Sequence, residues 1–368
     1  MGLTFILKKR NIFMRILVLV AVVIIAFASA LTLYLFFNST PSAATVTLTS
    51  NEIAVDSLNF LTKMKRTDGK YDYSMNCTDA AGCVKNGDSY TQTGAWAVLT
   101  YAGLYKTTGD SQYLQRMNGE ATDLMNSCSG KEDECMWVLV QMIRAYNITK
   151  NQQYLTFVKS MADRLMTNHD EENSSMLTGI ESRQFALVYE ITGDQKYLSE
   201  ANARLAKSKA AWNSAIDSFN APIYNSSSFI FYRYACWTEL AESKIALVSG
   251  DNQAKANVIN FLKSANFESN YKTMEHLSTL QPCIETLLNA YQQTGDKQYF
   301  DQAKFLMQYI VTYRWDSPIS VATKYNGDGA FLFEWFTGDN VKTVTDTGYM
   351  IYLLSQMPNE QFEILNWR

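Results

Sequence analysis

The sequence predicts an all-α domain, a closed (α/α)6 toroid of helical hairpins, behind an N-terminal transmembrane helix. The first observation is a turn that occurs five times, as in "ITGDQKYL" at 191–198 and "QTGDKQYF" at 293–300. The second is that segments before these turns carry few charges, whereas segments after them alternate apolar and charged residues with a helical period. The third is an uncharged apolar run near the N-terminus.

Residues 16–37 form that apolar run, which as a helix is long enough to cross the roughly 30 Å hydrocarbon layer. Four basic residues lie in the preceding tail, 1–15, so the tail is expected in the cytoplasm and the rest of the chain outside. A cleavable signal peptide is the alternative, because Ala28-Ser29-Ala30 has the small-x-small form. We favour an uncleaved anchor because the apolar run continues beyond that site. Residues 38–50 then read as a polar linker and 51–368 as the extracytoplasmic domain at the cell membrane.

The composition of the outer part excludes one class of partner. Without the four basic residues of the tail, the chain has 28 Lys and Arg and 36 Asp and Glu, a net charge of −8. This negative charge argues against nucleic acid as the partner. Five Asn-x-Ser/Thr sequons are compatible with a surface glycoprotein, although a chain rich in Asn, Ser and Thr also produces such sites by chance.

Six cysteines fit an oxidising compartment. Fifteen pairings are possible in principle. Cys77 with Cys83 and Cys128 with Cys135 are near neighbours that could each close a loop, which would leave Cys236 and Cys283 for each other.

The repeated turn has the residues of a tight helix–helix connection. Glycine tolerates the left-handed conformation that ends one helix, and the following Asp or Asn can cap the next. The spacings between successive turns are 41, 43, 57 and 45 residues, enough for two helices and two connections. The equivalent positions are Asp110, Asn151, Asp194, Asp251 and Asp296.

Helix counting completes the ring. The charge-poor segments before the turns are expected to be buried inner helices, and the amphipathic segments after them outer helices. An amphipathic helix is predicted at 51–65 and an apolar one at 347–357, which gives six helices of each kind. Six inner and six outer helices are the number that a closed (α/α)6 toroid contains. An open superhelix of the tetratricopeptide kind is the competing fold.

Here the sequence resembles the six-hairpin glycosidase superfamily, in which the "tGD..YL..A" hairpin recurs. The resemblance covers roughly residues 50–358 and implies an active-site cleft at the face opposite the short turns, with sugars, including uronic acids, as ligands. The resemblance includes no catalytic motif that can be matched to individual residues of this sequence. The longer connections at that face are 66–91, 127–134, 167–180, 213–232, 266–278 and 314–344.

Three tryptophans share a register, fourteen residues before the turn position: Trp96, Trp137 and Trp237. If they point inward they form a ring suited to stacking on sugar faces, and if not they are packing anchors between helices. Tyr73 and Trp335 add aromatics in the long connections. Arg183 and Arg233, near the starts of inner helices, are candidates for binding a carboxylate, with ion pairing as the plainer explanation.

Glycosidic hydrolysis commonly uses two carboxylates. Our catalytic candidates are Glu239 and Glu285, which the disulfide between Cys236 and Cys283 would bring to one level. Asp346, which also suits a helix cap, and Asp72, in a Gly-turn loop, complete the set. Asp68, Asp328 and Glu334 are further loop acids.

Two histidines, with no Cys-x-x-Cys pair, no HExxH and no phosphate-binding Gly loop, argue against a zinc or nucleotide enzyme, so we expect no cofactor and no metal. The sequence thus predicts a glycoside hydrolase-like protein whose partner is a glycan. The alternatives are a non-catalytic glycan-binding or scaffold protein and a uronate lyase or epimerase. The sugar, the linkage and the oligomeric state do not follow from the sequence.

Overall fold

The computed structural model describes residues 44–78, 82–86, 93–128, 135, 138–168, 175–217, 227–265, 267–270, 277–315, 330–334 and 340–366. Contacts divide the chain into one unit of Val46–Ile364, which contains all the described helices, and another of Met1–Thr45 with Leu365–Arg368. The predicted span at 16–37 lies outside the described residues. Among the helices that are described, none is long and apolar enough to cross a bilayer.

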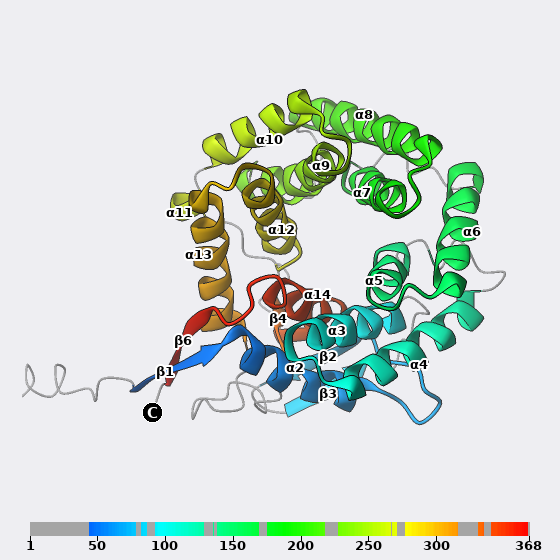
Figure 1. The fold of residues 1–368 in the computed structure, drawn as a ribbon. Coiled ribbons are helices and arrows are strands. Elements are labelled where there is room, and N and C mark those ends of the chain that lie inside the picture. Colours follow the sequence, from blue (N-terminus) through cyan, green and yellow to red (C-terminus); the bar gives the residue numbers. More distant parts are fainter. Residues whose placement is uncertain are drawn as a thin grey trace, which may run out of the picture. The chain divides into compact units, whose positions relative to one another are not determined.

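The described helices form two concentric layers (Figure 1). Each inner helix contacts the next, and the last contacts both the fifth and the first, so the inner ring closes. This confirms the toroid and excludes an open superhelix. The inner helices are α3 (Thr93–Thr108), α5 (Leu139–Thr149), α7 (Ser175–Thr192), α9 (Ser227–Ser249), α12 (Leu277–Thr294) and α14 (Val344–Leu354). The outer helices are α2 (Ser50–Met64), α4 (Ser111–Cys128), α6 (Gln152–Asn168), α8 (Gln195–Asp217), α10 (Asn252–Ala265) and α13 (Lys297–Arg314), with a short α11 (Phe267–Asn270).

The five turns have the predicted chemistry. The residue that ends each inner helix has φ of 55° to 73°, the left-handed region that glycine tolerates best. Each following Asp or Asn accepts a hydrogen bond of 2.8 to 3.1 Å from the backbone N–H two residues on, which caps the outer helix. The left-handed residues are Gly109, Lys150, Gly193, Gly250 and Gly295.

The aromatic residue after the turn joins neighbouring hairpins. Tyr154 Oη on α6 donates to Asn118 on α4 over 2.9 Å, and Tyr197 Oη on α8 donates to Asp163 on α6 over 2.8 Å. In these two repeats the tyrosine after the turn therefore links its outer helix to the preceding one.

The ring closes tightly where α14 meets α3. A Cβ placed on Gly348 would lie 3.1 Å from Trp96 Cβ and 3.2 Å from Thr100 Oγ1, so the two helices approach closely there. The start of α2 is tied to the residues after α14, because Ser50 Oγ donates to the Met357 carbonyl over 2.7 Å.

The fold is mainly helical, as predicted, and the described chain also contains two small sheets that the sequence analysis did not predict. Strands β1 (Ala44–Thr49) and β6 (Gln361–Asn366) pair with each other, so the predicted linker 38–50 ends in a strand. A four-stranded sheet has the order β3-β2-β5-β4. Its strands are β2 (Ser74–Thr78), β3 (Gly82–Asn86), β4 (Leu332–Glu334) and β5 (Asn340–Thr343).

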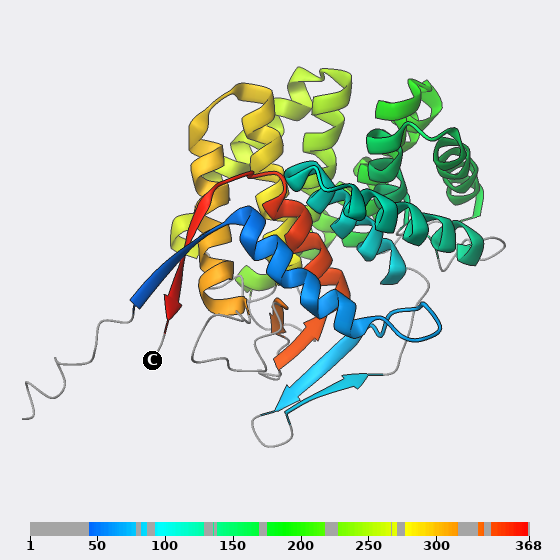
Figure 2. The same cartoon turned by 60° about the horizontal axis from the view of Figure 1, so that its bottom comes forward.

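This second sheet unites two of the predicted long connections, 66–91 and 314–344. β2 pairs antiparallel with β5, with Ser74 opposite Thr343. In Figure 2 the cyan and orange strands lie together at one end of the helical ring. The first and last long connections therefore share one face, as the hairpin arrangement predicts.

All three predicted disulfides are present. Cys77 is bonded to Cys83 within the β2–β3 hairpin, and Cys128 is bonded to Cys135. The third bond joins Cys236 of α9 to Cys283 of α12, two adjacent inner helices.

Candidate functional site

An aromatic cluster lies inside the ring, near the ends of the inner helices that face the long connections. The Tyr349 ring lies 5.6 Å from the Trp96 ring and 6.2 Å from the Trp237 ring, centroid to centroid. Trp96 and Trp237 come from α3 and α9 at the same register, so the structure brings two of the three predicted tryptophans together. Trp137 lies outside the described residues.

One polar atom of this cluster has no partner among the described residues. Trp237 is 8% exposed, and its buried indole Nε1–H meets no acceptor in the part of the chain that the structure describes. A buried unsatisfied donor costs about 1–3 kcal/mol. A sugar hydroxyl is an acceptor that would remove this cost while the rings stack on the sugar.

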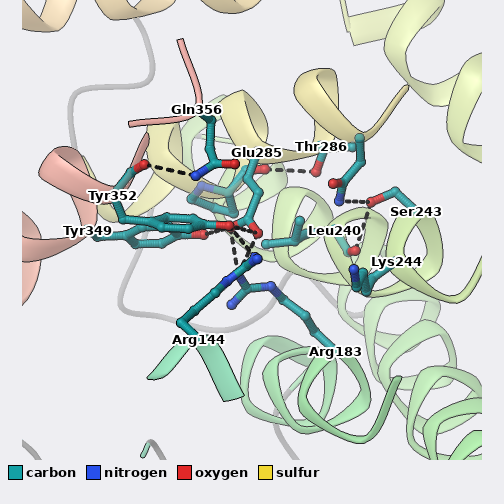
Figure 3. A network of polar contacts seen from close by, with 12 residues as sticks. Arg144, Arg183, Leu240, Ser243, Lys244, Glu285, Thr286, Tyr349, Tyr352 and Gln356 are labelled. Carbon is teal, nitrogen blue, oxygen red and sulfur yellow. Dashed lines mark hydrogen bonds and ion pairs between the residues drawn. The ribbon is translucent and has the colours of Figure 1, made fainter. Parts of the chain in front are cut away.

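Tyr349 of the aromatic cluster also belongs to a buried polar network (Figure 3). Arg183 Nη2 donates to both oxygens of Glu285, over 2.5 and 2.7 Å, and Tyr349 Oη donates to Glu285 Oε2 over 2.5 Å. Tyr352 Oη lies 3.5 Å from Glu285 Oε1 and accepts a hydrogen bond from Arg144. The network therefore connects α5, α7, α12 and α14 across the ring.

These contacts set the protonation of Glu285. Burial alone would raise the pKa of its carboxyl, but the charges of Arg183 and Arg144 outweigh burial and hold the pKa below its ordinary value. The group is thus ionised at neutral pH and cannot supply a proton as a general acid. Arg183 and the tyrosines occupy both of its oxygens, so the contacts define Glu285 first as the counter-ion of Arg183.

Glu239 lies on a different side of its helix from the aromatic cluster. Two residues correspond to about 200° around an α-helix, so Glu239 points away from the direction of Trp237. Its electrostatic neighbours are Glu242 on the same helix and Lys209 of α8, and Glu242 accepts a hydrogen bond from Asn257 of α10. Glu239 and Glu285 lie at similar positions along the axes of α9 and α12, but their side chains face different sides of the inner ring. The structure therefore does not bring this predicted pair together.

Burial, reinforced by the nearby charge of Glu242, raises the pKa of Glu239 to about 8 from its ordinary 4.5. The folded state therefore holds this proton more tightly than the unfolded state. The contribution of protonated Glu239 to the free energy of unfolding is fully present below about pH 4.5, and it is lost as the pH rises to about 8.

We expect Glu239→Gln to remove this pH dependence. Between pH 5 and 9, the free energy of unfolding of the unsubstituted chain should fall by on the order of 2–4 kcal/mol more than that of the variant. Urea unfolding at a series of pH values measures this, with Glu268→Gln, at an exposed position of α11, as the control. Parallel pH profiles for Glu239→Gln and the unsubstituted chain would contradict it.

The other two acids have structural partners. Asp346 belongs to the cap of α14, because Thr343 Oγ1 accepts from the Asp346 backbone N–H over 2.9 Å and donates to its carboxylate over 2.5 Å. Asp72 lies 3.2 Å from Lys85 Nζ and 3.8 Å from Arg66 Nη1, beside the four-stranded sheet. The capping reading of Asp346 thus has direct geometric support.

The remaining predicted site residues are only partly visible. The Tyr73 carbonyl accepts the backbone N–H of Val344 over 3.1 Å, which joins the first long connection to the start of α14. Arg233 belongs to α9, and its side chain is outside the described part of the structure, as is all of Trp335.

Sequence reasoning missed Arg144, Tyr349 and Tyr352. The signal available was in "TGYMIYLL", where two tyrosines three residues apart lie on one face of an otherwise apolar inner helix. Arg144 was equally visible, as the one charged residue of α5, Leu139–Thr149.

Comparisons with known proteins agree with this architecture. The solved structure of an unsaturated glucuronyl hydrolase specific for heparin has a TM-score of 0.60 at 10% identity, covering 83% of this chain and 96% of its own. A family 76 glycoside hydrolase (mannosidase) from Bacteroides thetaiotaomicron has 0.54 at 13%, covering 83% and 98%. An inactive variant of an alpha-1,6-mannanase from Salegentibacter, in complex with alpha-1,6-mannotriose, has 0.57 at 12%, covering 83% and 98%.

These likenesses, together with the closed ring, define the class: the chain has the six-hairpin glycosidase-like (α/α)6 fold. More particularly, residues 135–314, which contain α5, α7, α9 and α12, match the family model described as beta-L-arabinofuranosidase, GH127 catalytic domain. No curated relative matches the sequence.

Proposed function

We propose that this chain is a carbohydrate-active protein of the glycoside hydrolase type that binds an oligosaccharide at the long-connection end of the inner ring. The observation that carries the proposal is the aromatic cluster of Trp96, Trp237 and Tyr349 with its unsatisfied indole N–H. Aromatic faces stack on the apolar faces of pyranose or furanose rings, and the N–H supplies a directional contact.

The comparisons support a carbohydrate ligand. The matched family model describes an arabinofuranosidase catalytic domain, and one structural neighbour was solved with a bound mannotriose. Because the identities are only 10–13%, neither the sugar nor the linkage transfers to this chain.

Hydrolysis by a carboxylate pair is the reaction we propose. Among the described residues, Glu285 is committed to Arg183, and Glu239 faces away from the cluster. The acid and base would therefore come from the long connections, where the sequence offers Asp328 and Glu334. Their side chains lie outside the described residues.

A second candidate is a glycan-binding protein without catalysis. The observation that favours it is that Glu285 is bound by Arg183 and Tyr349. The described centre of the ring therefore has aromatic residues but no carboxylate pair free to act on a sugar. Binding and release of sugar must therefore be measured separately.

We also propose that the domain is extracytoplasmic and attached to the membrane through residues 16–37. The uncharged run and the basic tail before it support the anchor. The three disulfides support the location, since such bonds persist in oxidising compartments.

The test is an oligosaccharide-binding and reducing-sugar release assay on the purified full-length chain, with mannosides, arabinofuranosides and uronate-containing glycans. We expect Trp237→Ala to weaken binding at least ~10-fold, through lost stacking and the lost N–H contact. Trp237→Phe, which keeps a ring, should weaken it less. Tyr313→Ala removes an aromatic that is 62% exposed on α13 and should leave binding unchanged.

The outcomes separate the two candidates. Sugar release by the unsubstituted chain, lost together with binding in Trp237→Ala, supports the hydrolase. Binding without release supports the glycan-binding protein. Equal binding by Trp237→Ala, Tyr313→Ala and the unsubstituted chain would place the ligand away from the aromatic cluster and refute the site.

A further inference from the structure

The centre of the ring beneath the aromatic cluster has an excess of positive charge. Arg144 from α5 and Arg183 from α7 point toward the same carboxylate, Glu285, and toward Tyr352 (Figure 3). Lys244 of α9, which is 7% exposed, is matched by Glu190 over 2.8 Å. Among the described residues, two arginines thus share one buried carboxylate, which leaves about one positive charge there uncompensated.

The two guanidinium groups also have spare donors. Each carries five N–H groups. Within the described residues, Arg183 donates only through Nη2 to Glu285, and Arg144 only through Nη2 to Tyr352. Both Nε–H groups are buried and find no acceptor among the described residues, and the Arg183 side chain is only 6% exposed. Unfilled buried donors of a charged group favour an anion that accepts from them.

Register along the inner helices shows from which end such an anion would arrive. Trp96 and Trp237 stand fourteen residues before the turn position, Arg183 stands eleven before it, and Arg144 and Lys244 stand seven before it. At 1.5 Å per residue, Arg144 lies about 6 Å nearer the short-turn end than Arg183. Arg144 is half-buried, so solvent reaches part of its side chain. Tyr349, which is 3% exposed, lies between the arginines and the tryptophans and separates them.

We infer a second ligand site at the short-turn end of the ring's centre, where Arg144 binds a single oxyanion group, a carboxylate, sulfate or phosphate, in a forked geometry. Arg183, which shares the negative charge of Glu285 with Arg144, lies behind it. This site is separate from the aromatic cluster, since Tyr349 divides the two, and it does not depend on the proposed glycan site.

Electrostatics at the neighbouring lysines agrees with this inference. Burial and then the nearby charge of Arg144 lower the pKa of Lys106, whose Nζ donates to Gln356 over 3.2 Å. Burial likewise lowers the pKa of Lys244, and Arg144 acts in the same direction while Glu190 opposes it. The cations repel one another, and a bound anion would relieve that repulsion.

Calorimetric titration of the purified full-length chain at constant ionic strength tests the site, with inorganic sulfate and glucuronate as probes and glucose as the neutral control. We expect saturable binding of at least one anion and none of glucose. Arg144→Gln should weaken it at least 10-fold, and Arg144→Lys, which keeps the charge but loses the fork, several-fold. Arg116→Gln, exposed on outer helix α4, changes net charge equally and should have no effect.

The controls make each outcome decisive. Trp237→Phe should leave anion binding unchanged, which distinguishes this site from the glycan site. Tighter binding of glucuronate than of sulfate identifies a sugar acid as the ligand, and the reverse identifies a free inorganic anion. No saturable anion binding, or equal affinity in the unsubstituted chain and Arg144→Gln, would overturn the inference. If circular dichroism shows that Arg144→Gln is unfolded, Arg144→Lys decides by the same comparison.

Discussion

Glu285→Gln is expected to lower the free energy of unfolding by about 3–5 kcal/mol, because it breaks a buried ion pair by removing one of its charges. The reason is that Arg183 is 5% exposed and its guanidinium donates to no carboxylate other than Glu285 among the described residues. Removing the negative charge leaves a buried cation uncompensated. Denaturant unfolding followed by circular dichroism measures the change.

A double substitution distinguishes the lost ion pair from a packing defect. Arg183→Met combined with Glu285→Leu removes both charges, and it should recover much of the stability that Glu285→Gln loses. Asp301→Asn breaks the exposed pair with Lys297, whose side chain is 75% exposed, and should change stability little. A loss below about 1 kcal/mol in Glu285→Gln would show that water reaches Arg183 and solvates it.

The second large effect is expected from the disulfide between α9 and α12. Replacing Cys236 and Cys283 together by alanine opens a loop with a sequence separation of 47, which in the chain-entropy account costs about 4 kcal/mol. Both cysteines are fully buried between inner helices, so small cavities add to the loss. Urea unfolding of the oxidised protein and the double variant gives the difference.

The hairpin disulfide is the matched comparison. Cys77 and Cys83 are separated by only six positions, so their double alanine variant should lose about 2 kcal/mol. Equal losses for the two variants would show that loop entropy does not set the contribution of the inner-ring bond.

The hairpins could be predicted because their determinants are local. A left-handed residue followed by Asp or Asn specifies each turn within a few positions, and the observed caps follow that chemistry. The sheet was missed because its pairing is non-local: β2 finds β5 more than 260 residues later, and neither strand has a distinctive pattern by itself.

The candidate site was harder to predict because helical facing decides it. Trp237 and Glu239 are two residues apart, which already implies opposite sides of α9, yet level alone suggested pairing Glu239 with Glu285. Arg183 and Glu285 were both chosen as functional residues, but only the structure shows that they bind each other. Buried partners on different helices cannot be read from either helix alone.

The junction between the start of α2 and the residues after α14 has a consequence for how the chain is made. The hydrogen bond from Ser50 to Met357 joins positions 307 residues apart. During synthesis the apolar face of α3 that receives α14 stays uncovered until nearly the whole domain has emerged. The nascent chain therefore exposes apolar surface for most of its elongation, and the ring can close only after the last inner helix has been synthesised.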